Sequence, residues 1–182
     1  MAYDLFLRKQ IDTDYSRAAP APAPLPLAFT AVERKTLIQL EKSTAAFATA
    51  LVGWARQQGI AARITSTAIY TQEDTDKHYE EGRSGIKAGR LDWHQVGRAF
   101  HLAIPKLANG QDNLDAYARI GAYARSQGGE WLGDKPIRTT KGIIFDTAHF
   151  EYHPGVTIAA YRKLPVSVAE FKSAQKRRQR FG

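Results

Sequence analysis

The stretch from Trp93 to Ile104, WHQVGRAFHLAI, determines both the expected fold and the expected site. Its second part, residues 97–104, alternates loosely between apolar and other side chains, which predicts a strand of the core. Gly97 permits a close turn before this strand, so we expect His94 on a loop and His101 on the strand. Six residues separate the two histidines, a spacing that suits two ligands of one metal ion but is not specific on its own.

Helices and strands are expected on both sides of this stretch. They are a helix over about 31–58, a strand over 60–70, a short polar helix over 71–81, a loop over 83–93, a helix from Asp112 or Asn113 to about Ser126, strand segments over 142–145 and 149–152, a further strand over 157–161, and a basic helix over 168–180. Capping-box signatures at Thr30–Glu33 and Ser167–Glu170 mark the starts of the first and last helices. The pattern predicts an α+β fold with a small, mostly antiparallel sheet and flanking helices.

The chain divides into three parts by composition. Residues 18–27, AAPAPAPLPL, favour extended polyproline geometry and are expected to form a semi-rigid arm that lies along the domain or docks on a partner. We therefore expect an N-terminal segment over 1–29, one domain over 30–162, and a basic C-terminal helix over 163–182.

Composition restricts the chemistry and the location. The 182 residues include no cysteine, which excludes disulfides and thiolate metal sites. No apolar run is long enough to predict a membrane span, and the first residues carry Asp4 and Arg8 where a secretory signal would be apolar. The sequence thus predicts a protein made in the cytoplasm that reaches any target outside by another route.

The net charge of +8 favours polyanionic partners such as nucleic acid, anionic cell-wall polymers or lipopolysaccharide. Six basic residues against one acidic residue lie between Lys163 and Gly182. This basic segment is either a binding element or an ordinary solvated helix end. Nucleic acid is not expected, because aromatic residues are not interleaved with the basic ones in a stacking pattern.

Histidines are the candidate metal ligands. His94, His101 and His149 supply the three protein ligands that a catalytic zinc site usually has. Asp146 comes three residues before His149 and cannot share its strand face, so a local bend is needed to bring both to one point. There Asp146 can accept a proton from the attacking water. The alternative is that these are ordinary surface or core residues of a basic protein.

Two more residues are expected to support this site. Glu151 lies two residues after His149, on the same strand face, and can orient its imidazole. His153 is a candidate for an outer-shell or substrate contact.

Four stretches over about residues 60–155 resemble, in order, the zinc peptidases that include D-alanyl-D-alanine carboxypeptidases and phage L-alanyl-D-glutamate endolysins, relatives of the hedgehog-type metal fold. They are Ile64–Thr67 with the polar helix that ends at Tyr79–Ser84, the run Trp93–His101, the turn Gly128–Asp134, and Asp146–Glu151. The resemblance implies a zinc ion on the three histidines, Asp146 as catalytic base, and peptide stems of peptidoglycan as substrates.

The chain departs from this family at three positions. His101 stands where the family has an aspartate ligand, which raises the positive charge of the expected site. Tyr70 and Lys77 stand where the family has an arginine and a glutamine that hold substrate. Tyrosine cannot replace the bidentate contact of a guanidinium, so Lys77, Arg83 or Arg90 are the candidate substrate-binding cations.

Two functions follow as expectations. The first is a phage endolysin or virion-associated lysin that acts on the bacterial cell wall, with the basic C-terminal helix bound to anionic wall or outer-membrane surfaces. The second is a catalytically inactive peptidase-like component of a phage or phage-tail-like particle, docked on other particle proteins by its N-terminal arm.

Overall fold

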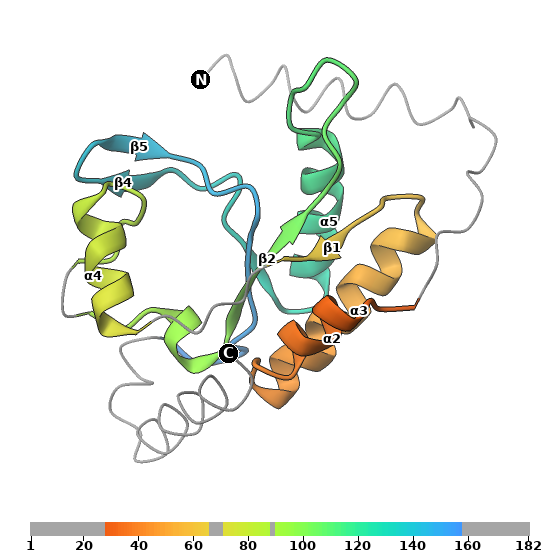
Figure 1. Ribbon diagram of the computed structural model, residues 1–182, viewed down its shortest axis with the longest axis horizontal. Coiled ribbons are helices and arrows are strands. Elements are labelled where there is room, and N and C mark those ends of the chain that lie inside the picture. The colour runs from red at the N-terminus through yellow and green to blue at the C-terminus, as the bar shows by residue number, and fades with distance from the viewer. Residues whose placement is uncertain (1–27, 66–70, 88–89, 158–182) are drawn as a thin grey trace.

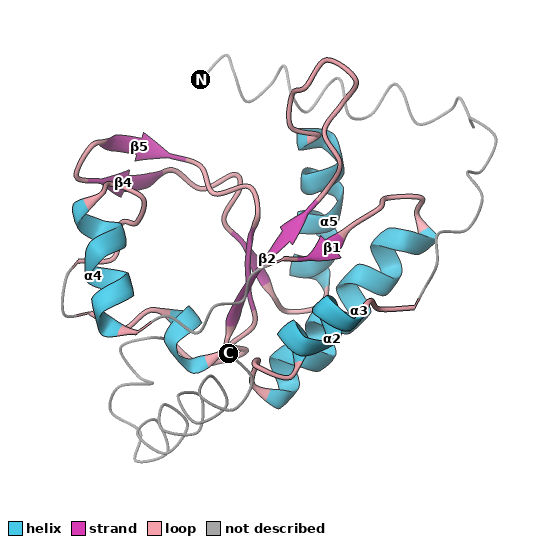
Figure 2. Ribbon diagram, in the orientation of Figure 1, coloured by secondary structure: helices cyan, strands magenta, loops and turns pink. Residues whose placement is uncertain are grey.

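A computed structural model describes residues 28–65, 71–87 and 90–157. Within these ranges the protein has a mixed α+β fold with a small antiparallel sheet and four α-helices (Figure 2). The elements are α2 (Ala31–Leu37), α3 (Lys42–Gln57), β1 (Arg63–Ile64), α4 (Gln72–Glu80), the 3₁₀ helix η1 (Trp93–Val96), β2 (Ala99–Ala103), α5 (Leu114–Ser126), β3 (Glu130–Trp131), β4 (Ile137–Thr139), β5 (Gly142–Ile144) and β6 (His149–Glu151). No helix in the described ranges has the length and apolarity that a membrane crossing requires.

The main sheet has the strand order β1-β2-β6-β3, and every neighbouring pair is antiparallel. In the central pair, Phe100 lies opposite Phe150 and His101 lies opposite His149. Directly opposite residues share a sheet face, so the two phenylalanines lie on one face and the two histidines on the other. Strands β4 and β5 form a separate hairpin.

The core lies on the phenylalanine face of this sheet. Phe100 and Phe150 are fully buried in one cluster with apolar residues of α3 and α5, including Leu51 and Ile120. The hairpin β4–β5 and α4 lie on the opposite side of β2 from α3 and α5 (Figure 1). They contact each other where Thr140 Oγ1 donates to the Tyr79 carbonyl oxygen at 3.1 Å. A second, smaller layer, made of α4 and the hairpin β4–β5, thus lies on the side of β2 away from the core helices.

The predicted single helix over 31–58 is wrong, because the chain breaks at residues 38–41 into α2 and α3. Glu41 caps α3 by accepting from the backbone N–H groups of Ser43 and Thr44. The backbone N–H of Glu41 also donates to the Gly97 carbonyl oxygen at 2.9 Å. At the break, the start of α3 therefore contacts the turn that precedes β2. This contact joins residues far apart in the sequence, so a local pattern does not predict it.

Most other predicted elements within the described ranges are confirmed, with different lengths. The helices at α4 and α5 and the strands at β2, β5 and β6 are present. The strand predicted over 60–70 is reduced to Arg63–Ile64, and residues 66–70 lie outside the described part. β3 lies in the stretch 128–134 that the sequence predicts as a turn, and no element is predicted over β4. Residues 1–27, the predicted strand beyond Thr157 and the predicted helix over 168–180 also lie outside the description.

A buried ion pair joins α2 to α3. Arg56 Nη2 lies 2.6 Å from Glu33 Oε1, and the two side chains are only 7% and 3% exposed. The guanidinium also donates to the carbonyl oxygens of Ala62 and Ala28, while Glu33 Oε2 accepts from the Thr30 N–H within the capping box. The pair therefore fixes α2, the end of α3 and the approach to β1 together.

Removing one member of this pair is expected to destabilise the fold. Arg56→Met leaves the Glu33 carboxylate buried without its cation and should lower the free energy of unfolding by about 3 kcal/mol. The double variant Glu33→Gln/Arg56→Met retains no buried charge and should lose less. Urea unfolding followed by circular dichroism measures both, and a double variant less stable than the single one would contradict this account.

Candidate metal centre

His94 is held on a one-turn helix by a reciprocal cap. Asp92 Oδ1 accepts from the His94 N–H at 2.8 Å, and Gln95 Oε1 accepts from the Asp92 N–H at 2.8 Å. Gly97 ends the turn in the left-handed region at φ 73°, where a side chain would also approach the Glu41 nitrogen to 2.9 Å. Asp92 and Gln95 are buried. Sequence analysis missed both residues, although Asp-x-x-Gln is a detectable capping signal.

His101 and His149 are positioned by strand register, and Asp146 by a turn. The two histidines face each other across β2 and β6. The His149 N–H donates to the Asp146 carbonyl oxygen at 3.2 Å, which closes the turn before β6. This turn is the local bend that the spacing of Asp146 and His149 required.

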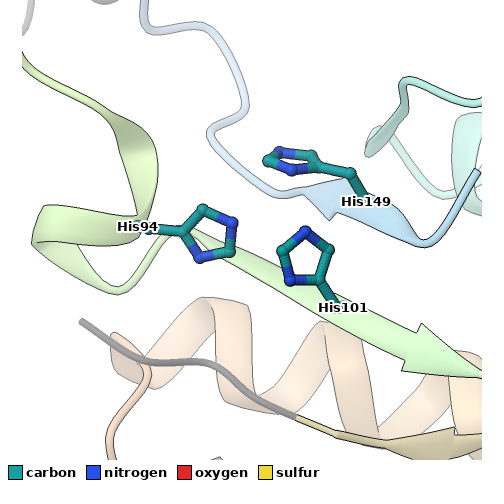
Figure 3. Close-up of side chains that lie close together, drawn as sticks. All are labelled: His94, His101 and His149. Atoms are coloured by element: carbon teal, nitrogen blue, oxygen red, sulfur yellow. The ribbon is translucent and has the colours of Figure 1, made fainter. Parts of the chain in front are cut away.

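Three imidazoles converge at this point (Figure 3). Their ring centroids lie 4.8 Å (His94–His101), 4.9 Å (His94–His149) and 5.1 Å (His101–His149) apart. One ring nitrogen from each lies within 4.8 Å of the others. Two nitrogens bound to one zinc at about 2.1 Å are at most about 4 Å apart, so modest side-chain adjustment would suffice. The donor set therefore fits a divalent ion such as zinc.

Asp146 lies beside this cluster. Its Oδ2 is 3.5 Å from His101 Nε2 and 3.6 Å from His149 Nδ1. Burial raises the pKa of the Asp146 carboxyl, but the hydrogen bonds and charges of His101 and His149 outweigh it and hold the pKa far below its usual range. The carboxylate is therefore ionised, and its side chain remains 32% exposed to water.

The protonation of the imidazoles differs. Burial, with His149 and His101 as neighbours, lowers the pKa of His94 well below its ordinary value, so that ring is neutral and suited to bind metal. Burial also acts to lower the pKa of His149, but Asp146 and Glu151 outweigh it and raise the pKa to about 9. A metal ion must therefore displace a proton from His149.

Glu151 determines which nitrogen of His149 is available. Its Oε1 lies 2.9 Å from His149 Nε2, and a carboxylate can only accept, so Nε2 carries a hydrogen. Nδ1 is then the nitrogen that faces Asp146 and can bind a metal. Glu151 Oε2 lies 2.9 Å from His153 Nε2, so His153 is connected to the cluster through Glu151.

Trp131 supports the turn that carries Asp146. Its indole Nε1 donates to the Thr147 carbonyl oxygen at 2.8 Å. The ring lies between Gly121 of α5 and Gly133, where a Cβ at either glycine would approach an indole carbon to 2.2 Å. The tryptophan- and glycine-containing stretch 128–134, which includes β3, thus packs against the turn that carries Asp146.

Two of the predicted substrate-binding residues, Lys77 and Arg83, share one acidic partner. Lys77 Nζ lies 3.9 Å from Glu81 Oε1 with its side chain 68% exposed, and Arg83 Nη2 lies 2.5 Å from Glu81 Oε2. Both cations therefore form ion pairs at the end of α4. Tyr70 lies outside the described residues.

A comparison with models of known protein families finds no match, and a search of curated protein sequences finds no similar protein.

Zinc binding can be tested on the histidines directly. His101→Ala removes a ligand and should weaken zinc binding at this cluster by more than about 100-fold, beyond the 10–100-fold loss typical of outer-shell changes. His78→Ala, in α4, is the matched control and should leave the affinity unchanged. Competition with a chromophoric chelator measures both, and equal affinity in the wild type and His101→Ala would exclude the three-histidine site.

The stability of the metal-free protein should depend on pH in both directions. Burial raises the pKa of Glu151, but the hydrogen bonds and charges of His149 and His153 outweigh burial and lower this pKa from 4.5 to about 2. The contribution of Glu151 to the free energy of unfolding is therefore full above pH 4.5 and is lost as the pH falls toward 2. The pKa of His149 is raised from 6.5 to about 9, so its contribution is full below pH 6.5 and is lost as the pH rises through 9.

We therefore expect maximal stability between about pH 4.5 and 6.5. Urea midpoints recorded with EDTA present measure this profile. Glu151→Gln should reduce the loss of stability on both the acid and the alkaline side of the profile. A wild-type stability maximum above pH 9 would contradict the roles assigned to Glu151 and His149.

Proposed function

We propose that this protein is a zinc-dependent peptidase that cleaves the peptide stems of peptidoglycan, on a fold of the hedgehog and D-Ala-D-Ala-peptidase type. One observation carries the proposal: His94, His101 and His149 converge, and the ionised Asp146 lies 3.5 and 3.6 Å from nitrogens of two of them. Motif resemblance supports the substrate class, because these residues stand at the ligand and base positions of that family, with His101 in place of its aspartate.

His94, His101 and His149 would hold the zinc ion. When bound, zinc polarises the scissile carbonyl and makes the attacking water more acidic. All three proposed ligands are imidazoles, so Asp146 is not one of them and can act as base. Its side chain is 32% exposed, so water can reach the carboxylate.

Asp146 performs the proton transfers. It accepts a proton from the water as the water oxygen attacks the carbonyl carbon, and returns it to the nitrogen as the C–N bond breaks. Glu151 holds His149 with Nδ1 toward the reaction, and the Asp92–Gln95 cap holds His94. These contacts hold both imidazoles in position before a substrate binds.

The biological setting is part of the same proposal. The protein acts as a phage endolysin or virion-associated lysin, made in the host cytoplasm and active on the cell wall. Residues 163–182 would bind anionic wall or outer-membrane surfaces through their basic side chains.

Hydrolysis of purified peptidoglycan tests the proposal. The wild-type protein with zinc should release new amino groups, and EDTA should stop the release. Asp146→Asn keeps the size of the side chain but removes the base, and should lower the rate at least about 100-fold. Asp112→Asn makes the same change at an exposed residue of a loop. It is the control and should retain full activity.

The negative outcomes are informative. Full activity of Asp146→Asn would remove the mechanism. A protein that neither binds zinc nor hydrolyses peptidoglycan, but associates stably with phage particle proteins, would support the alternative of an inactive structural component.

A further inference from the structure

A second group of metal-ligating side chains lies beside the first. Glu130 of β3 and Glu151 of β6 are register partners on adjacent antiparallel strands, and His153 follows β6. One ligand atom from each lies within 4.8 Å of the others. Glu151 and His153 are largely buried, with side chains 13% and 12% exposed, while that of Glu130 is 42% exposed.

The ligand atoms in this group point at one place. His153 Nε2 lies 2.9 Å from Glu151 Oε2 and 3.5 Å from Glu130 Oε1. His153 Nδ1 lies 3.0 Å from the Val156 carbonyl oxygen, which can only accept, so Nδ1 carries a hydrogen. Nε2 is therefore the nitrogen that faces two carboxylates, and a cation must stand between them, either a proton or a metal ion.

Neighbouring residues fix the orientation of two of these ligands. Trp93 stacks on the His153 ring with centroids 4.3 Å apart and planes at 14°. Lys135 Nζ lies 2.7 Å from Glu130 Oε2, which leaves Oε1 toward His153. The hydrogen bond from His153 Nδ1 to the Val156 carbonyl oxygen is the kind of outer contact that orients metal-ligating histidines.

We propose that Glu130, Glu151 and His153 form a second divalent metal site, which binds Zn²⁺ and leaves coordination positions open to water. One imidazole and two carboxylates are a ligand set that zinc accepts. Spacings of 2.9 and 3.5 Å between the ligand atoms are near the roughly 3.4 Å that separates neighbouring ligands in a tetrahedral zinc site.

Glu151 would connect the two sites. Its Oε1 contacts His149 Nε2 and its Oε2 faces the second site, so one carboxylate orients a ligand of the first ion and binds the second. The second site does not require the protein to be a peptidase, because its geometry is independent of Asp146.

Zinc stoichiometry of the full chain tests this inference. The protein is equilibrated with Zn²⁺ at fixed free concentration, and bound zinc is measured by elemental analysis. We expect two ions per chain in the wild type, one in Glu130→Gln, one in His101→Ala and none in the double variant. Because Glu130 would be a ligand, zinc affinity at the second site should fall by more than about 100-fold in Glu130→Gln, beyond the 10–100-fold loss typical of outer-shell changes.

Two further variants guard against misfolding and unspecific effects. Glu130 is partly exposed, so Glu130→Gln should fold, which thermal unfolding verifies. His153→Phe keeps a ring against Trp93 while removing the ligand nitrogen, and should also bind one ion. Glu73→Gln, an exposed carboxylate of α4, is the control and should bind two.

The pattern of zinc loss among the variants shows whether the second site exists. A single ion lost in His101→Ala and kept in Glu130→Gln overturns the second site and leaves the first. A single ion lost in Glu130→Gln and His153→Phe but kept in His101→Ala supports the second site and removes the metal of the proposed peptidase. Two ions that both variants retain, or no bound zinc at all, overturn the inference.

Discussion

The pairing of β2 with β6 is the constraint on which the rest of the structure depends. It sets Phe100 against Phe150 on one face of the sheet and His101 against His149 on the other. A shift of one residue would exchange the faces, exposing an aromatic ring and burying an imidazole in the apolar core. The same register therefore determines both the hydrophobic packing and the position of two imidazoles of the histidine cluster, and neither can change without the other.

Electrostatics link the groups on the histidine face into one series. The series of contacts runs from Asp146 through His149, Glu151 and His153 to Glu130. Polar atoms of successive members lie between 2.9 and 3.6 Å apart. Carboxylates alternate with imidazoles, so each negative group has a basic ring next to it. Removal of protons from the rings would leave adjacent carboxylates without compensation, which is why cations are favoured along the whole series.

The sequence predicted the parts of this arrangement that local pattern encodes. The strand around His101, the bend between Asp146 and His149, and the contact of Glu151 with His149 all follow from strand periodicity. The break between α2 and α3 depends on a hydrogen bond between Glu41 and Gly97, which lie 56 positions apart, and β3 has two residues, too few to show a period. The ion pairs of Lys77 and Arg83 with Glu81 depend on how α4 ends.

The indole of Trp131 has a consequence for how this protein can vary. It fills the space that Gly121 and Gly133 leave open, and its N–H holds Thr147 in the turn next to Asp146. Glycine within a helix costs about 1 kcal/mol relative to alanine, so an alanine at 121 would suit the helix taken alone. A designer who stabilises α5 by helix propensity would thus push the indole away and displace the turn that carries Asp146.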